Sequence, residues 1–246
     1  MNQRLAVVTG GIGGLGTEIC LHLARSGTMV VAADLPGRAE RVAAFGAETA
    51  GLDIRFEPVD VTDHEACGQL VQRLQDRHGC VDILVNAAGI TRDTTLRKME
   101  PGQWRDVLRV NLDGVFNMCR HVVEGMSGRG FGRIVNICSV NGQTGQFGQT
   151  NYSAAKAGMH GFTMALAREV ARKGVTVNSV SPGYCETALV MAIPEPIRSR
   201  ILDSVPVGRL GRPAEIARVV DFLCAEDSGF ITGANIPVNG GLYMGF

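Results

Sequence analysis

The sequence has no excess of charge of either sign, because Lys plus Arg and Asp plus Glu each number 24 among its 246 residues. Nucleic-acid-binding proteins carry basic clusters that neutralise phosphates. The basic pairs present here, Arg38 with Arg41 and Arg129 with Arg133, are interpreted as solvated faces, so nucleic acid is not expected as a partner. No apolar run approaches the roughly 18 residues that a membrane helix needs. We therefore expect no membrane partner either.

Signals for export, disulfides and metals are also lacking. The amino end has no charged leader followed by a long apolar core, which is the mark of a signal peptide. The seven cysteines are scattered and form no CxxC pair, and the five histidines show no ligand spacing. This pattern disfavours a disulfide framework or a zinc site and suits a reducing compartment. We expect a cytoplasmic protein without a bound metal.

Short β-branched runs alternate with helical patterns along the whole chain, which is long enough for one α/β domain over residues 1–246 and short for two. The strands read as near-continuous apolar runs, which favours a doubly wound parallel sheet of seven strands with helices on both faces. Strands are expected at 5–9, 29–33, 54–59, 83–86, 133–137, 176–180 and 234–238, and helices near 14–26, 38–50, 63–78, 103–126, 151–172 and 213–224. The proline-rich segment 183–212 follows a strand end, and we expect it to be a mobile lid containing a short helix.

A glycine-rich turn follows the first expected strand and opens the first helix. Its residues are Gly10, Gly11, Ile12, Gly13, Gly14, Leu15 and Gly16. Glycine permits a tight turn and lets a pyrophosphate approach the positive end of the helix. The surrounding strand, turn and helix favour a dinucleotide site over a simple tight turn.

Asp34 ends the second expected strand, where a carboxylate can accept hydrogen bonds from the adenosine ribose and would repel a 2′-phosphate. Gly13 places no basic side chain in the turn to offset that repulsion. The sequence therefore favours NAD(H) over NADP(H), although Arg38 or Arg41 could reach a 2′-phosphate. Asp60, followed by Val61, ends the third strand and either accepts from the adenine amino group or caps the next helix.

Further cofactor contacts are expected where later strands end. Small residues in the run Asn86-Ala87-Ala88-Gly89 would let cofactor and backbone come close. Pro182 and Gly183 end the sixth strand, and the Thr187 hydroxyl could meet a nicotinamide carboxamide. With Tyr152 and Lys156, described next, these residues complete the expected cofactor site.

Tyr152 and Lys156 lie four positions apart, which places them on one face of a helix. A free phenol titrates near ~10, and a neighbouring ammonium lowers that pKa. The Ser139 hydroxyl could hold a substrate carbonyl beside the phenol. Such a group can pass a proton to or from an oxygen while a hydride moves.

Taken in order, the runs TGGxGGxG and NAAG, Asn111, Ser139, YxxxK and SPG resemble the short-chain dehydrogenase/reductase family over essentially the whole chain. The resemblance implies a single-domain Rossmann fold. It also implies that Tyr152 protonates the substrate carbonyl oxygen and that Ser139 orients the carbonyl. Lys156 would lower the Tyr152 pKa and hold the nicotinamide ribose, while Asn111 would kink its helix and hold a water that connects Lys156 to solvent.

The segments 89–93, 97–99, 139–143, 145–152 and 160–164 are similar to members of the family that reduce acetoacetyl-CoA. The implied reaction is reduction to (R)-3-hydroxybutyryl-CoA, for polyhydroxybutyrate synthesis, with Lys98 meeting the negative groups of CoA. The implied substrate residues are Asp93, Lys98, Ser139, Gln146, Phe147, Gln149 and Tyr184. Two alternatives with the same chemistry stay open, namely reduction of an acyl-carrier-protein thioester and NAD-dependent oxidation of a 3-hydroxy acid. The intact Ser139, Tyr152 and Lys156 argue against a non-catalytic nucleotide sensor.

The chain departs from the family pattern at three places. The common NNAG is NAAG here, which we expect to cost a little rigidity. Cys138 stands where relatives often have serine, and we interpret it as a buried packing residue. Asp34 differs from the many relatives that prefer NADPH. The helices at 103–126 and 151–172 carry surplus apolar surface, and the resemblance implies a homotetramer that packs them pairwise.

Overall fold

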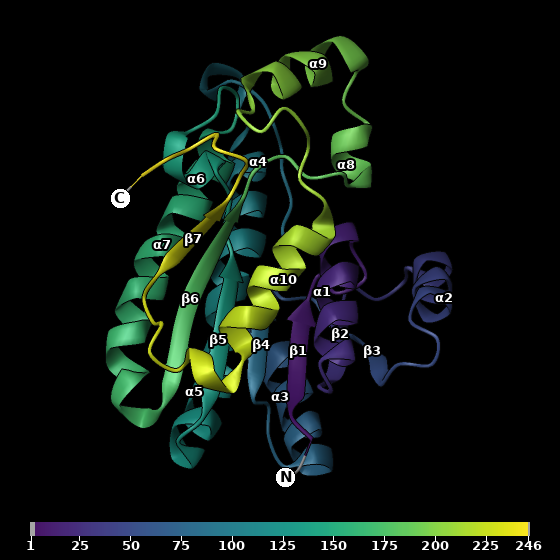
Figure 1. Cartoon of the computed structure of the whole chain (residues 1–246), viewed down its shortest axis with the longest axis vertical. Helices are drawn as coiled ribbons and strands as arrows, with labels where there is room; N and C mark the ends of the chain where they lie inside the picture. Colours follow the sequence, from purple (N-terminus) through teal and green to yellow (C-terminus); the bar gives the residue numbers. More distant parts are fainter. Residues whose placement is uncertain (1–2, 246) are drawn as a thin grey trace.

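The computed structural model describes residues 3–245 as a layered α/β structure (Figure 1). Its seven strands form one parallel sheet in the order β3-β2-β1-β4-β5-β6-β7. The strands are β1 (Leu5–Thr9), β2 (Met29–Asp34), β3 (Ile54–Pro58), β4 (Ile83–Asn86), β5 (Gly132–Ile137), β6 (Val175–Pro182) and β7 (Asn235–Val238). The seven-stranded parallel sheet predicted from the sequence is confirmed.

Helices cover both faces of the sheet because successive strand residues point to opposite sides. Leu5 and Val7 of β1 belong to a core shared with α3, α5 and α7, whereas Ala6 and Val8 face a second core with α1, α2 and α10. In Figure 1, α1 and α10 cross in front of the central strands. The α-helices are α1 (Gly14–Arg25), α2 (Ala39–Glu48), α3 (His64–His78), α4 (Pro101–Leu108), α5 (Gly114–Arg129), α6 (Asn141–Thr144), α7 (Thr150–Val170), α8 (Ala188–Met191), α9 (Glu195–Ser204) and α10 (Pro213–Cys224). Three short 3-10 turns add η1 (Leu96–Lys98), η3 (Ala171–Lys173) and η4 (Glu226–Ser228).

The strand order reverses between β1 and β4. Strands β2 and β3 extend the sheet on one side of this pair, and β5, β6 and β7 extend it on the other. In open parallel sheets, ligands bind in the crevice outside the carboxyl ends of the strands at such a reversal. Thr9 pairs with Asn86 at this point, so the glycine turn and the run after β4 meet there.

The helix predicted over 103–126 is divided into α4, a π-helical turn η2 (Arg109–Asp113) and α5. The Asn111 amide explains the interruption. Its Nδ2 donates to the Val107 carbonyl, four residues back, at 2.8 Å and to the Ile90 carbonyl at 2.9 Å. A side chain that takes a backbone acceptor disturbs the regular helical ladder.

The segment 183–212 contains two helices, α8 and α9, rather than the single short helix predicted. Pro194 caps α9, so the prolines divide the helical stretch. The base of the segment is fixed, because Glu186 N donates to the Gly211 carbonyl and Gly211 N donates to the Tyr184 carbonyl, both at 2.9 Å. Figure 1 shows α8 and α9 beyond the carboxyl ends of the strands.

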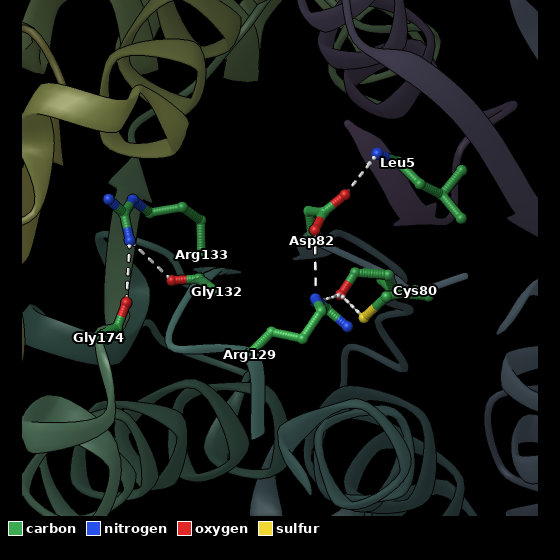
Figure 2. Close-up of polar contacts among 8 residues, drawn as sticks. Leu5, Cys80, Asp82, Arg129, Gly132, Arg133 and Gly174 are labelled. Carbon is green, nitrogen blue, oxygen red and sulfur yellow. Dashed lines mark hydrogen bonds and ion pairs between the residues drawn. The ribbon is translucent and has the colours of Figure 1, made fainter. Parts of the chain in front are cut away.

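Hydrogen bonds from charged side chains connect the strands at the amino-terminal end of the sheet, opposite the crevice (Figure 2). Asp82 accepts from Leu5 N at 2.9 Å and from Arg129 Nη2 at 3.3 Å. The interpretation of Arg133 as part of a solvated face is wrong, since the residue is 3% exposed. Its Nη1 donates to the carbonyls of Gly132 and Gly174 at 2.9 and 3.3 Å. Buried cations persist where such acceptors surround them, and this one ties β5 to β6.

Two further observations concern membrane-spanning helices and the state of the cysteines. Among the described residues, no helix has both the length and the apolar character needed to cross a bilayer. All seven cysteines are buried as free thiols.

Candidate active site

The glycine turn is packed too closely for side chains. Gly10 has φ of 65°, and a Cβ there would lie 2.8 Å from the Cα of Ala88. A Cβ at Gly11 would lie 2.7 Å from the Cα of Ala32. Helix α1 begins at Gly14, so its amino-terminal N–H groups face a turn that has no side chain at Gly13. Ile12 is buried within the second core, and Leu15 packs against that core from its edge.

Thr9 braces the turn in a way that sequence reasoning missed. Its Oγ1 accepts from the N–H groups of Ala87 and Ala88, both at 3.2 Å. Asn86 instead points into the core, where its Nδ2 donates to Asn136 Oδ1 at 2.8 Å. Only the backbone of Asn86 is therefore available to a cofactor. Thr9 therefore holds the backbone of the run 86–89, in which Ala87 stands at the position of the second asparagine of NNAG.

Asp34 and two arginines form the adenosine end of the crevice. Asp34 is buried, accepts from Leu35 N at 2.8 Å and pairs with Arg38 Nη1 at 3.3 Å. The sequence left open that Arg38 or Arg41 could reach this part of the crevice, and both arginines lie there. Arg41, 29 residues beyond Ile12, donates to the Ile12 carbonyl at 2.6 Å and to Thr17 Oγ1 at 2.8 Å. A tertiary contact brings in the charge that position 13 lacks.

Asp60 and Val61 lie at the end of β3. Asp60 Oδ1 accepts from Thr62 N at 2.9 Å, so the carboxylate supports its own turn beside α3. Asp63, rather than Asp60, caps α3 by accepting from Ala66 N at 2.9 Å. The Val61 side chain is buried in the first core, and its carbonyl accepts from Asn117 Nδ2 at 2.8 Å.

The predicted catalytic residues come together at the carboxyl end of β5. Ser139 follows this strand; its Oγ accepts from Asn141 N at 3.1 Å and lies near enough to the Tyr152 phenol to lower the pKa of that group. Lys156 is 4% exposed, its Nζ donates to the Ile137 carbonyl at 2.7 Å, and this nitrogen lies 5.7 Å from the centre of the Tyr152 ring. A Cβ on Gly89 would lie 2.7 Å from Asn111 Oδ1 and 3.7 Å from Lys156 Nζ, so these groups are neighbours. Within residues 3–245, the buried Asn111 Oδ1 has no hydrogen-bond partner.

The predicted lowering of the Tyr152 pKa by Lys156 stays a prediction, because burial is the largest influence on the pKa of both groups in this structure. Burial raises the pKa of Tyr152 to about 12, and the nearby Ser139 hydroxyl only partly opposes that rise. Burial also lowers the pKa of Lys156 to about 8. Desolvation disfavours the charged form of each group.

The first residues of the lid reach the glycine turn. Pro182 ends β6 beside Val238 of β7, and a Cβ at Gly183 would lie 2.9 Å from the Cα of Asn239. A Cβ at Gly14 would lie 3.5 Å from Thr187 Cγ2. Thr187 therefore lies over the amino terminus of α1, where it also begins α8.

Among the described residues, those predicted to contact substrate form no single hydrogen-bonded cluster. Gln149 Nε2 donates to Asp93 Oδ2 at 2.8 Å, and Gln149 Oε1 accepts from Asn141 Nδ2 at 2.9 Å. Asn141 was not predicted, although it lies in the segment that carries the resemblance. Phe147 is 87% exposed. Lys98 and Gln146 are also exposed, and Tyr184 is partly buried.

Comparison with known proteins identifies this crevice. The profile described as short chain dehydrogenase matches residues 4–198. The chain belongs to the short-chain dehydrogenase family. This membership makes the protein an oxidoreductase and implies a nicotinamide cofactor.

Several full-length relatives have names that specify a reaction. The chain is 54% identical to acetoacetyl-CoA reductase of Allochromatium vinosum, over 98% of this chain and 99% of that protein. It is 51% identical to acetoacetyl-CoA reductase of Cupriavidus necator, over the full length of both. It is 44% identical to 3-oxoacyl-(acyl-carrier-protein) reductase of Pseudomonas aeruginosa, over 99% of both chains.

Proposed function

We propose that this protein reduces acetoacetyl-CoA to (R)-3-hydroxybutyryl-CoA with a nicotinamide cofactor. The observation that carries the proposal is that Ser139 and buried Lys156 both lie beside the Tyr152 side chain at the carboxyl end of β5. The similarity to acetoacetyl-CoA reductases over the whole chain supports the choice of substrate.

The residues of the crevice fit a dinucleotide. The glycine turn leaves no room for side chains, and the α1 amino terminus beside it suits a pyrophosphate. Tyr152 and Lys156 would hold the nicotinamide ribose, with the backbones of Asn86, Gly89 and Gly183 and the Thr187 hydroxyl nearby. When bound, the cofactor supplies the hydride that reaches substrate C3.

Tyr152 serves as the general acid, and stabilisation of its phenolate by Lys156 has to offset the raised pKa of the phenol. With a pKa of about 12 the phenol is fully protonated at neutral pH and has a proton to give. Lys156, with a pKa of about 8, is mostly an ammonium there, so it stabilises the phenolate left after transfer. Ser139 orients the carbonyl. Asn111 Oδ1, which lacks a described partner, accepts from a water that returns the proton through Lys156.

NAD(H) is the favoured cofactor because the buried Asp34 carboxylate stands where a 2′-phosphate would bind. Arg38 and Arg41 make use of NADP(H) feasible. The ratio of kcat/KM for NADH and NADPH tests this choice. Replacing Asp34 with Ala should shift the ratio toward NADPH by at least about tenfold, whereas the exposed Asp53→Ala control should not. A wild-type preference for NADPH would show the charge argument to be wrong.

Substrate contacts are proposed at the mouth. Asp93, Gln146, Phe147, Gln149 and Tyr184 border the acyl group, and the Lys98 ammonium meets the negative groups of CoA. The lid 183–212 closes over this mouth as part of one domain. The product would enter polyhydroxybutyrate synthesis, in the cytoplasm, where the seven free thiols remain reduced.

A second candidate is reduction of an acyl-carrier-protein thioester, because a reductase of that name is 44% identical. Turnover of acetoacetyl-CoA and of acetoacetyl-carrier protein, each with NADH and NADPH, separates the two. We expect the CoA thioester to have the higher kcat/KM. A large preference for the protein thioester would favour the second candidate, and turnover of free 3-hydroxybutyrate with NAD alone would favour an oxidative role.

A further inference from the structure

A chain of polar side chains extends from the catalytic group to His160, a residue that the proposed reaction does not use. Cys138, which precedes Ser139, is buried, and its thiol lies beside the Ser179 side chain on β6. Ser179 Oγ lies 3.3 Å from His160 Nδ1. His160 follows Lys156 by one turn of α7, so the two side chains share a face of the helix.

The direction of these hydrogen bonds fixes the tautomer of His160. The Asn235 amide oxygen can only accept, and it receives the hydroxyl protons of Ser179 at 3.0 Å and of Ser181 at 2.8 Å. Since the Ser179 proton is committed there, its oxygen can only accept from the imidazole. His160 therefore carries a proton on Nδ1, which in the neutral ring is its only ring proton. Its Nε2 lone pair is buried and has no partner within the described chain.

Lys156 is the charged group that acts on His160. Burial and the Lys156 ammonium both lower the pKa of His160. Cys138 and Tyr152 stay neutral because burial raises their pKa values to about 11 and about 12. Ser179 on β6 and Asn235 on β7 carry no charge. Coupling between two titrating groups is reciprocal, so a proton on His160 must disfavour the proton on Lys156.

We propose that His160 is a positioning residue for Lys156. The neutral imidazole holds Ser179, and through it Cys138, behind the lysine. A proton on the imidazole introduces a second buried cation and weakens the ammonium that stabilises the Tyr152 phenolate. Activity would then fall on the acid side of neutrality, through a group that never touches substrate. The kinetic part of this proposal rests on the proposed reductase function.

The coupling can be tested without substrate by NMR titration of ¹³C-labelled histidine side chains. In the wild type, His160 should titrate below the ordinary histidine pKa. In Lys156→Met its pKa should rise, because the neighbouring positive charge is gone. His78, the last residue of α3, serves as the control and should titrate alike in both proteins. An unchanged His160 titration in Lys156→Met would overturn the proposal.

Two substitutions separate positioning from packing. His160→Asn keeps an N–H donor at the place of Nδ1 but cannot gain a proton, whereas His160→Leu loses both properties. With acetoacetyl-CoA and NADH, His160→Asn should keep most of the neutral-pH kcat and lose the acid limb of the pH profile. His160→Leu should lose kcat about tenfold, or about 1.4 kcal/mol, with little change in KM. His78→Asn should retain the wild-type profile.

An acid limb that persists in His160→Asn, or equal losses in the Asn and Leu variants, would contradict the positioning role. If circular dichroism shows that His160→Leu does not fold, Ser179→Ala replaces it as the test variant. This change removes the hydroxyl that accepts from His160 Nδ1, so it should also lower kcat. If no form of the enzyme reduces acetoacetyl-CoA, the proposed function fails, and the NMR titration alone then decides whether Lys156 and His160 are coupled.

Discussion

At the scale of single residues, the central feature is that burial disfavours the charged forms of both Tyr152 and Lys156. The pKa of Tyr152 is raised to about 12 and that of Lys156 is lowered to about 8, each mainly by burial. The spacing of the two residues was predictable from the sequence. Their protonation was not, because it depends on the protein packed around them. The contacts of Thr9 and Arg41 with the glycine turn were missed for a related reason, since both cross between elements that are distant in sequence.

Tyr152→Phe tests the assignment of the general acid. Loss of the hydroxyl should lower kcat by about 10²–10⁴-fold, the usual contribution of a positioned acid. Binding of NADH, followed by its fluorescence, should be nearly unchanged because the ring remains. Tyr243→Phe, near the carboxyl end of the chain, is the matched control. A Tyr152→Phe enzyme with wild-type kcat would refute the mechanism.

Lys156→Met should stabilise the fold while abolishing activity. The Lys156 pKa falls from 10.5 to about 8 on folding, so the folded protein disfavours the charged form. At pH 7, below both values, that cost is fully present and is at most about 3 kcal/mol. The free energy of unfolding, measured by urea denaturation, should be higher for Lys156→Met than for the wild type, and this difference should be largest at pH 7. The difference should shrink as pH rises from about 8 toward 10.5, and a constant difference would contradict the burial argument.

At the scale of elements, local signals placed α10 at its observed bounds, with Pro213 in the first turn and an apolar stripe behind it. They did not predict η2, because the Asn111 contact with Ile90 comes from another segment, although the family resemblance implied that Asn111 would kink its helix. They also missed the division of the lid, although Pro194 lies at the division. The lid is anchored to α10 by Arg209, whose two Nη atoms reach Glu215 at 2.7 and 2.8 Å. Arg212 N donates to the same carboxylate at 2.8 Å.

Glu215→Gln should loosen this anchor. The hydrogen bonds from Arg209 and Arg212 lower the pKa of Glu215 from 4.5 to about 2. A carboxylate with a depressed pKa stabilises the fold above its unfolded pKa and loses that effect as pH falls through its folded pKa. The wild type should therefore have the higher melting temperature at pH 5–8, and the difference should vanish near pH 2. The variant should also show a raised KM for acetoacetyl-CoA. Glu195→Gln, at the start of α9, is the control, and an equal shift in both variants would refute the anchor.

At the scale of the whole molecule, only some of the apolar side chains predicted to pack between copies of the chain are exposed to solvent. Val107 and Val115 are buried in the chain's own core, whereas Phe116 on α5 is 49% exposed and Met164 on α7 is 53% exposed. Large exposed apolar side chains on two neighbouring helices favour association with a second copy. The proposed homotetramer would pair these helices between copies.

Light scattering on the wild type and on Phe116→Glu and Met164→Glu tests that pairing. Each glutamate would place a charge where an apolar contact is proposed, so both variants should form smaller species with unchanged circular dichroism. Phe147→Glu is the matched control: Phe147 is 87% exposed and is proposed to border the substrate, so this change should raise KM and leave the mass unaltered. A wild type that scatters as a monomer would refute the tetramer. Variants that keep the wild-type mass would place the interface on another face.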